Sequence, residues 1–302
     1  MSASLPGPLA AIANIFRDPP PEHIFEVSPE CLAYVRPAAP EQIQYRELVP
    51  GTVQVSPLKD NLADPLAFKQ AILHLTSGLP ASKKPRPAAL ILPDFAARLQ
   101  ILDFDTFPSN PEEQQALVRF RMKKSIPFDV ESAAVSFYQQ PSSVSSKKVE
   151  VVAALMSLEI TGRYEAPFRE CGFHPGLVTT SALASMDLLP TTGLNLVAKL
   201  SGGSLTVMVL DGSSLRLARC VELEEGTLDE LSSLIYPTLI FVEDELKRRP
   251  EQMLLCGFGA ETASIAAQWQ HELSIPALPL QSRFGAPLRW NAGLLGYLQG
   301  VK

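Results

Sequence analysis

Residues 23–36, HIFEVSPECLAYVR, combine two short apolar runs with a Ser28-Pro29 step between them. This pattern predicts a strand, a turn and a second strand, because serine and proline favour turns while β-branched and aromatic residues favour strands. Residues 194–219 repeat it in three apolar runs, with turn signals at 202–203 and 211–212. The two related openings are compatible with an old duplication, and they predict two lobes that each begin with a strand and a turn.

Helices alternate with strands through the rest of the chain, which is typical of an α/β protein. Asp64-Pro65 predicts a helix start, since aspartate caps the first N–H groups and proline suits the first turn, and Gly78 predicts its end. Asn110-Pro111 starts a second helix, which ends ahead of Pro127. Further strands are expected at 88–93, 99–104, 133–140, 148–156, 252–256 and 275–280, and further helices up to residue 171, at 227–249, at 260–273 and from about residue 290.

The composition limits the classes of function. With 302 residues, 46% of them hydrophobic, the chain exceeds the size at which single cores usually divide. The net charge of -6 argues against a general nucleic-acid binder, which needs a basic surface to displace counterions from phosphates. The cysteines and histidines are dispersed, so neither a metal site nor a disulfide framework is predicted, and no apolar run reaches the ~18 residues of a membrane-spanning helix.

Seven segments carry a resemblance through their order and spacing: 89–94 (ALILPD), 112–128, 135–139 (VSFYQ), 151–154 (VVAA), 169–173 (RECGF), 253–259 (MLLCGFG) and 292–296 (AGLLG). In this order they resemble the PilM family, actin-like cytoplasmic proteins of type IV pilus assembly that are similar to the cell-division protein FtsA. The resemblance covers the chain from about residue 22. It implies an α/β, two-lobed actin-like (ribonuclease H-like duplicated) fold with a small α+β subdomain inserted in the first lobe.

The same resemblance implies a division of the chain. The expected parts are an N-terminal extension (1–21), the first part of the first lobe (22–95), the inserted subdomain with a return strand and helix (96–172), the second lobe (173–275) and a C-terminal return to the first lobe (276–302).

Actin-like ATPases hold the phosphates of a nucleotide between two Asp-x-Gly turns, whose glycines let the backbone approach the phosphates closely. In the first turn of this chain Ser28 replaces the glycine, Pro29 removes an N–H donor, and Glu30 would repel a triphosphate. In the second turn two glycines remain, but no aspartate precedes them. The resemblance therefore implies a vestigial nucleotide cleft without catalytic residues, formed by Glu26, Ser28, Gly202, Gly203, Gly257 and Gly259.

This interpretation predicts a pseudo-ATPase that needs no cofactor. No P-loop, dinucleotide fingerprint, nucleophile elbow or H-E-x-x-H motif is present. Two alternatives stay open: residual binding or slow hydrolysis of ATP with magnesium, and the cytoplasmic actin-like domain of a type II secretion platform of the GspL class. That second family continues into a membrane helix and a periplasmic domain, which the sequence to Lys302 does not contain.

The family resemblance also implies partners and a location. A PilM-like scaffold is cytoplasmic, peripheral at the inner membrane, and binds the cytoplasmic N-terminal peptide of a PilN-type membrane protein; PilO-type proteins and the pilus motor ATPases are indirect partners. In the family the peptide lies in a groove between the first lobe and the inserted subdomain, which corresponds here to residues 92–98 and 117–128. The expected contacts are Phe95, Arg98, Phe120 and Phe128.

Two further features have two interpretations each. An apolar stripe at helical spacing near the N-terminus could be a local packing segment or an anchor to a membrane or a partner. It consists of Leu5, Leu9, Ile12 and Phe16. A basic cluster could complete the dipole of its helix or meet anionic lipid headgroups, and consists of Arg119, Arg121, Lys123 and Lys124.

Overall fold

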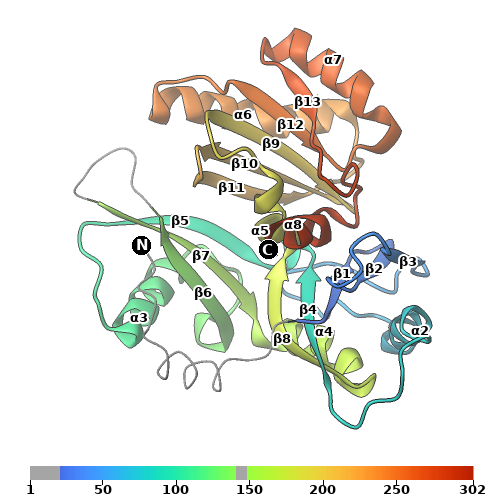
Figure 1. The fold of residues 1–302 in the computed structure, drawn as a ribbon. Helices are drawn as coiled ribbons and strands as arrows, with labels where there is room; N and C mark the ends of the chain where they lie inside the picture. The colour runs from blue at the N-terminus through green and yellow to red at the C-terminus, as the bar shows by residue number, and fades with distance from the viewer. Residues whose placement is uncertain (1–20, 141–147, 302) are drawn as a thin grey trace, which may run out of the picture.

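The computed structural model describes residues 21–140 and 148–301 (Figure 1). The predicted N-terminal stripe of Leu5, Leu9, Ile12 and Phe16 lies outside these residues.

Two five-stranded sheets form the two lobes, and both have the same topology (Figure 1). The first has the order β3-β2-β1-β4-β8 and the second the order β11-β10-β9-β12-β13. In each, the first strand pairs antiparallel with its hairpin partner and parallel with a later strand, so β1 and β9 occupy equivalent positions. The duplication predicted from the two strand–turn–strand openings is therefore present in the fold.

The strands of the first lobe are β1 (His23–Val27), β2 (Cys31–Val35), β3 (Gln44–Glu47), β4 (Arg86–Leu92) and β8 (Phe173–Thr180). Those of the second lobe are β9 (Leu194–Ser201), β10 (Ser204–Asp211), β11 (Ser214–Glu222), β12 (Gln252–Cys256) and β13 (Ala277–Pro279). The sequence did not predict β3, because its four residues are all exposed and show no apolar alternation.

Helices form three layers around the two sheets (Figure 1). One apolar cluster packs α2 (Pro65–Leu75) and α4 (Leu158–Glu170) against the first sheet. A second packs α6 (Leu228–Leu246) and α7 (Thr262–Leu273) against the second sheet. A third, central cluster contains residues of both sheets together with α5 (Ser181–Ser185) and α8 (Ala292–Gly300), which lie between the lobes. Short 3-10 turns complete the described elements: η1 (Asp94–Ala96), η2 (Val130–Ser132), η3 (Met186–Leu188) and η4 (Gly259–Glu261).

The inserted subdomain is a three-stranded sheet covered by one helix. Its strands are β5 (Arg98–Phe104), β6 (Ala133–Gln140) and β7 (Val149–Ser157), in the order β5-β7-β6, and its helix is α3 (Pro111–Met122). It has its own apolar cluster, to which α3 contributes Val118 and Met122. The predicted α+β subdomain is therefore confirmed, and the predicted cap is too, since the Asn110 side chain accepts from the N–H groups of Glu112 and Glu113.

Two of the four basic residues near the end of α3 hold the helix in place. The Arg119 guanidinium donates to the carbonyl groups of Val130 and Ala133. The Arg121 guanidinium donates to the carbonyl of Asp103 at 3.1 Å and lies 5.1 Å from the ring centre of Phe104. Arg119 and Arg121 therefore help to pack α3 against the rest of the subdomain.

Two predicted domain boundaries are wrong. The second lobe does not begin at residue 173, because β8 pairs in parallel with β4 in the first sheet. It does not end at residue 275, because β13 pairs in parallel with β12 in the second sheet. The physical reason is that the chain leaves the first sheet after β4, builds the subdomain and α4, and only then returns with β8. The second sheet therefore extends from Leu194 to Pro279.

The subdomain is also tied to the second lobe. The Gln140 amide donates to the carbonyl of Leu215 at 2.6 Å and accepts from the N–H of the same residue at 3.0 Å. Beside it, the Arg216 guanidinium forms an ion pair with the carboxylate of Glu150, and both side chains are less than one-tenth exposed.

Along the described parts of the chain, no helix is both long enough and apolar enough to cross a bilayer.

Candidate functional site

The turn between β1 and β2 is closed by its own serine. The Ser28 hydroxyl donates to the carbonyl of Cys31 and accepts from the N–H of the same residue, both at 2.9 Å. Ser28 is 2% exposed. Its hydroxyl is therefore used inside the turn and does not face an open cleft.

The tips of the two hairpins touch. Pro29, in the first turn, packs against Gly202, in the turn between β9 and β10: a Cβ atom placed on Gly202 would lie 2.9 Å from both Cγ and Cδ of Pro29. Gly202 also has a φ of +55°, which favours glycine. The two turns predicted to correspond to the phosphate turns are thus brought together, and a proline ring fills the contact between them. Gly203 is exposed, with open space around it.

Glu26 does not line an open cleft as the sequence predicted. It is 1% exposed and accepts hydrogen bonds from the Ser181 hydroxyl and from the N–H groups of Gly293 and Leu294, the latter two at 3.2 and 2.6 Å. The N–H groups at the start of α8 are free to donate to a carboxylate, so Glu26 caps this helix from the first sheet. Burial raises the pKa of Glu26, against the opposing effects of Lys199 and the hydrogen bonds.

A buried charged link joins the two lobes. Asp94 follows β4 in the first lobe, and its carboxylate accepts from Lys199 Nζ of β9 at 2.8 Å and from the Thr206 hydroxyl of β10 at 2.9 Å. Its other oxygen accepts from the N–H of Ala182, at the start of α5, at 2.6 Å. Burial lowers the pKa of Lys199, but the carboxylates of Asp94 and Glu26 more than offset this, so its pKa is raised.

Sequence reasoning missed this link. Lys199 is the only charged residue of the strand LNLVAKLS, in which all eight residues are buried. A lysine inside a buried strand requires a buried anion, because an unpaired charge is too costly to remove from water. That signal was available, but the identity of the anion depends on the packing of two segments about 100 positions apart.

The turn after β12, which contains the predicted cleft residues Gly257 and Gly259, is packed on one side and open on the other. Gly257 has a φ of +84°, and a Cβ atom on it would lie 2.2 Å from the carbonyl oxygen of Leu200. Gly259 has a φ of +59°, but a Cβ atom there would meet nothing within 4 Å. Gly257 is therefore needed for the close approach of β9 to the end of β12, whereas Gly259 lies at a surface opening with Glu30, Leu288 and Trp290.

The structure brings together two of the four residues predicted to contact a partner peptide. The Arg98 guanidinium lies 5.3 Å from the ring centre of Phe95, beside the start of β5. Phe120, on α3, is 74% exposed, and Phe128 is half-buried against the subdomain core. Arg98 also lines a small pocket between the first lobe and β11.

A recess of about 160 Å³ does lie between the inserted subdomain and the first lobe. Its subdomain wall comes from β6 and β7, and its other wall from the end of β8 and the start of α5. Small apolar side chains such as Ala134, Val135 and Leu183 line it together with the hydroxyl groups of Ser136, Thr161, Thr179 and Thr180, and none of residues 117–128, the other wall expected from the sequence, is among the lining residues. Within 21–140 and 148–301, no group of three or more His, Cys, Asp or Glu side chains could hold a metal ion.

No family model and no curated protein matches the sequence. The fold matches a chain of the PilM–PilN type IV pilus biogenesis complex with a TM-score of 0.71 and 19% sequence identity, over 94% of this chain and 100% of that chain. This chain has a PilM-like fold. Weaker similarities include an actin-like ATPase-fold protein of Bacteroides thetaiotaomicron (TM-score 0.48, 10% identity, 85% of this chain and 89% of that one). Another is the cytoplasmic domain of EpsL from the type II secretion system of Vibrio cholerae (TM-score 0.47, 13% identity, 77% and 80%).

Proposed function

We propose that this PilM-like chain is a non-catalytic scaffold of type IV pilus assembly, which docks the cytoplasmic N-terminal peptide of a PilN-type membrane protein. The observation that carries the proposal is the match to a chain of the PilM–PilN complex along that chain's whole length. In this proposal the chain is cytoplasmic and peripheral at the inner membrane, and it reaches PilO-type proteins and the motor ATPases through its partner.

The groove between the first lobe and the inserted subdomain is the proposed docking site. The recess beside β6 supplies the floor of this site. Phe95, Arg98, Phe120 and Phe128 do not line the recess itself, and they are proposed as further contacts of the peptide outside it. Because Phe120 is 74% exposed, its side chain can be removed with little effect on the core.

Blocking the recess is expected to weaken peptide binding at least tenfold. Ser136 is exposed and lines the recess, so Ser136→Arg would fill it without disturbing buried residues. Calorimetric titration with the cytoplasmic N-terminal peptide of a PilN-type protein from the same organism would measure the change. Ser264→Arg, on the exposed face of α7, is the matched control and should bind like the unaltered chain. Equal affinity of the two variants, or no binding by the folded chain, would contradict the docking proposal.

We also propose that the chain is a pseudo-ATPase. The supporting observations are the contact between Pro29 and Gly202, the burial of Glu26 at the start of α8, and the pairing of Lys199 with Asp94. The Pro29–Gly202 contact occupies the space between the two hairpin turns where a triphosphate would lie. Glu26 and Lys199 already have protein partners and are not free to bind a nucleotide.

ATP with magnesium is therefore expected to leave the melting temperature unchanged. A ligand at a hundred times its dissociation constant would add about 2.7 kcal/mol of stability, which corresponds to several degrees for a chain of this size. Thermal unfolding with and without millimolar ATP and magnesium measures this directly. A shift of several degrees would instead support the alternative of a residual nucleotide-binding cleft.

A further inference from the structure

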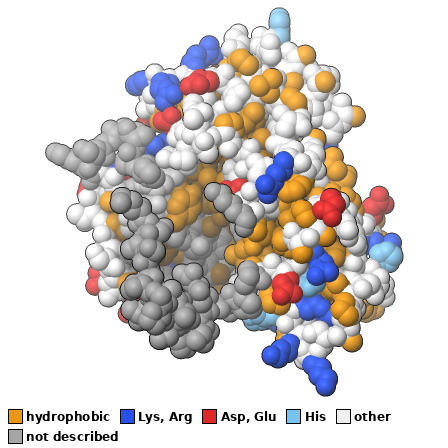
Figure 2. Space-filling view, in the orientation of Figure 1, with side chains coloured by type: hydrophobic (Ala, Val, Ile, Leu, Met, Phe, Trp, Pro, Cys, Tyr) orange, Lys and Arg blue, Asp and Glu red, His pale blue; other side chains and the backbone are white. Residues whose placement is uncertain are grey.

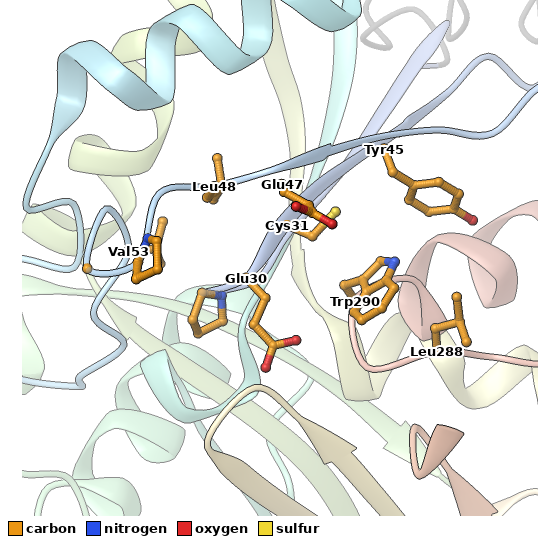
Figure 3. A pocket seen from close by; sticks show the side chains of 11 residues that line it. Glu30, Cys31, Tyr45, Glu47, Leu48, Val53, Leu288 and Trp290 are labelled. Carbon is orange, nitrogen blue, oxygen red and sulfur yellow. The ribbon is translucent and has the colours of Figure 1, made fainter. Parts of the chain in front are cut away.

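A groove of about 640 Å³ lies next to the closed cleft (Figure 3). It runs between β2 and β3 on one side and the segment that leads into α8 on the other. Tyr45 stands at one end, and its hydroxyl accepts a hydrogen bond from the Asn291 amide at 3.0 Å. Most of the wall is apolar: Pro29, Leu48, Pro50, Val53, Leu288 and Trp290.

The charged side chains of the groove are both acidic. Glu30 comes from the first hairpin turn, and Glu47 lies on β3 as the strand partner of Cys31 (Figure 3). No lysine or arginine lines the groove, and none of the ion pairs in the described part of the chain involves either carboxylate. Burial, with the nearby Glu47 and Glu30, raises the pKa of the Cys31 thiol to about 11, so this side chain stays neutral.

The groove continues into a second opening. Glu30, Leu288 and Trp290 line both, and the second opening extends along the turn after β12, where it reaches Glu261. Arg289 also lines this second opening, so the groove's positive charge is at this end, where the Arg289 Nε–H donates to the carbonyl of Gly257. The result is an elongated, solvent-open groove with acidic groups along an apolar floor. On the face that Figure 2 shows, hydrophobic side chains also gather where the lobes meet.

We propose that this groove binds an extended segment of a partner protein in which a lysine or arginine stands between apolar residues. The cation would lie between Glu30 and Glu47, while its aliphatic stem packs on the face of Trp290. The volume of the two joined openings is larger than a single small amine would fill, and this favours a peptide as the ligand. The groove is separate from the recess beside β6, so this proposal does not depend on the docking of a PilN-type peptide.

The test begins with a displayed library of random twelve-residue peptides. It is selected in parallel on the full chain and on the double variant Glu30→Gln, Glu47→Gln. We expect peptides with a lysine or arginine beside apolar residues to be enriched on the unaltered chain and not on the double variant. Both glutamates are exposed, so the variant should melt at the same temperature.

One enriched peptide is then titrated while tryptophan fluorescence is recorded. Trp290 lines the groove, whereas Trp269, the only other tryptophan, is fully buried in the second lobe. The double variant should bind at least tenfold more weakly, because neither glutamine offers a charged acceptor to the cation of the peptide. Glu41→Gln, an exposed glutamate that does not line the groove, is the matched control and should bind normally. Replacing the peptide's basic residue by norleucine should weaken binding to the unaltered chain and have little effect on the double variant.

Several results would overturn the proposal. These are a lack of enrichment, enriched peptides without a basic residue, or equal binding by the double variant. If n-butylammonium binds as tightly as the peptide, the occupant is a small amine. If the chain self-associates in sedimentation and the double variant does not, the occupant is a second copy. Either result would exclude a partner segment as the occupant.

Discussion

Replacing Asp94 with asparagine is expected to lower the free energy of unfolding by about 3–5 kcal/mol, because it removes one partner of a buried ion pair. Lys199 is 1% exposed and would keep its charge without an anion at 2.8 Å. The amide could still accept from the N–H of Ala182 but would present N–H groups toward the lysine. Urea unfolding followed by circular dichroism gives the change in stability.

Two further variants separate this link from a general effect of losing a carboxylate. Asp211→Asn breaks the Arg248–Asp211 pair, whose arginine is 47% exposed, and should cost less than about 1 kcal/mol. Asp94→Asn combined with Lys199→Met should recover much of the stability, because no unpaired charge is then left inside. A loss for Asp94→Asn no larger than that for Asp211→Asn would show that the interlobe pair does not stabilise the fold.

Gly257→Ala is expected to destabilise the chain by about 3 kcal/mol or more. The new Cβ would lie 2.2 Å from the carbonyl oxygen of Leu200, so β9 and the end of β12 would have to move apart. The residue must also keep a φ of +84°, which L side chains rarely adopt. Urea unfolding of the variant measures the loss.

Gly259→Ala provides a close comparison two residues away. It also has a positive φ, +59°, but its Cβ would meet no atom within 4 Å. Its cost should therefore be limited to the backbone term of about 1 kcal/mol. Similar losses for the two variants would mean that the approach of Leu200 is not what requires glycine at position 257.

The sequence predicted most of the fold because its helix starts and strand turns are strong local signals. The cap at Asn110, the strand at 252–256 and the glycine turn at 202–203 all appear where expected. It did not predict β8 as a strand, and the place of β8 beside β4 is set by a connection through the whole subdomain. No local pattern tells which sheet a strand rejoins after so long a path.

The candidate site was predictable in part. The substitution of Ser28-Pro29 for a glycine turn is visible in the sequence, and the structure adds that Pro29 contacts Gly202. The role of Glu26 was not predictable, because its donors lie on α5 and α8, more than 150 positions away. Such buried polar pairs depend on tertiary packing, and sequence reasoning can identify only one partner at a time.

The central apolar cluster has a mechanical consequence. It contains Ile24 and Ile91 of the first sheet with Val197 and Met208 of the second, so a hinge between the lobes would have to expose it. Each such side chain contributes about 1.5–3 kcal/mol when buried. The cluster is therefore expected to resist hinge opening between the lobes, which would keep the recess beside β6 and the groove beside β3 near a fixed separation. If both proposed surfaces are occupied, the two ligands would be held at a nearly fixed spacing by this packing alone.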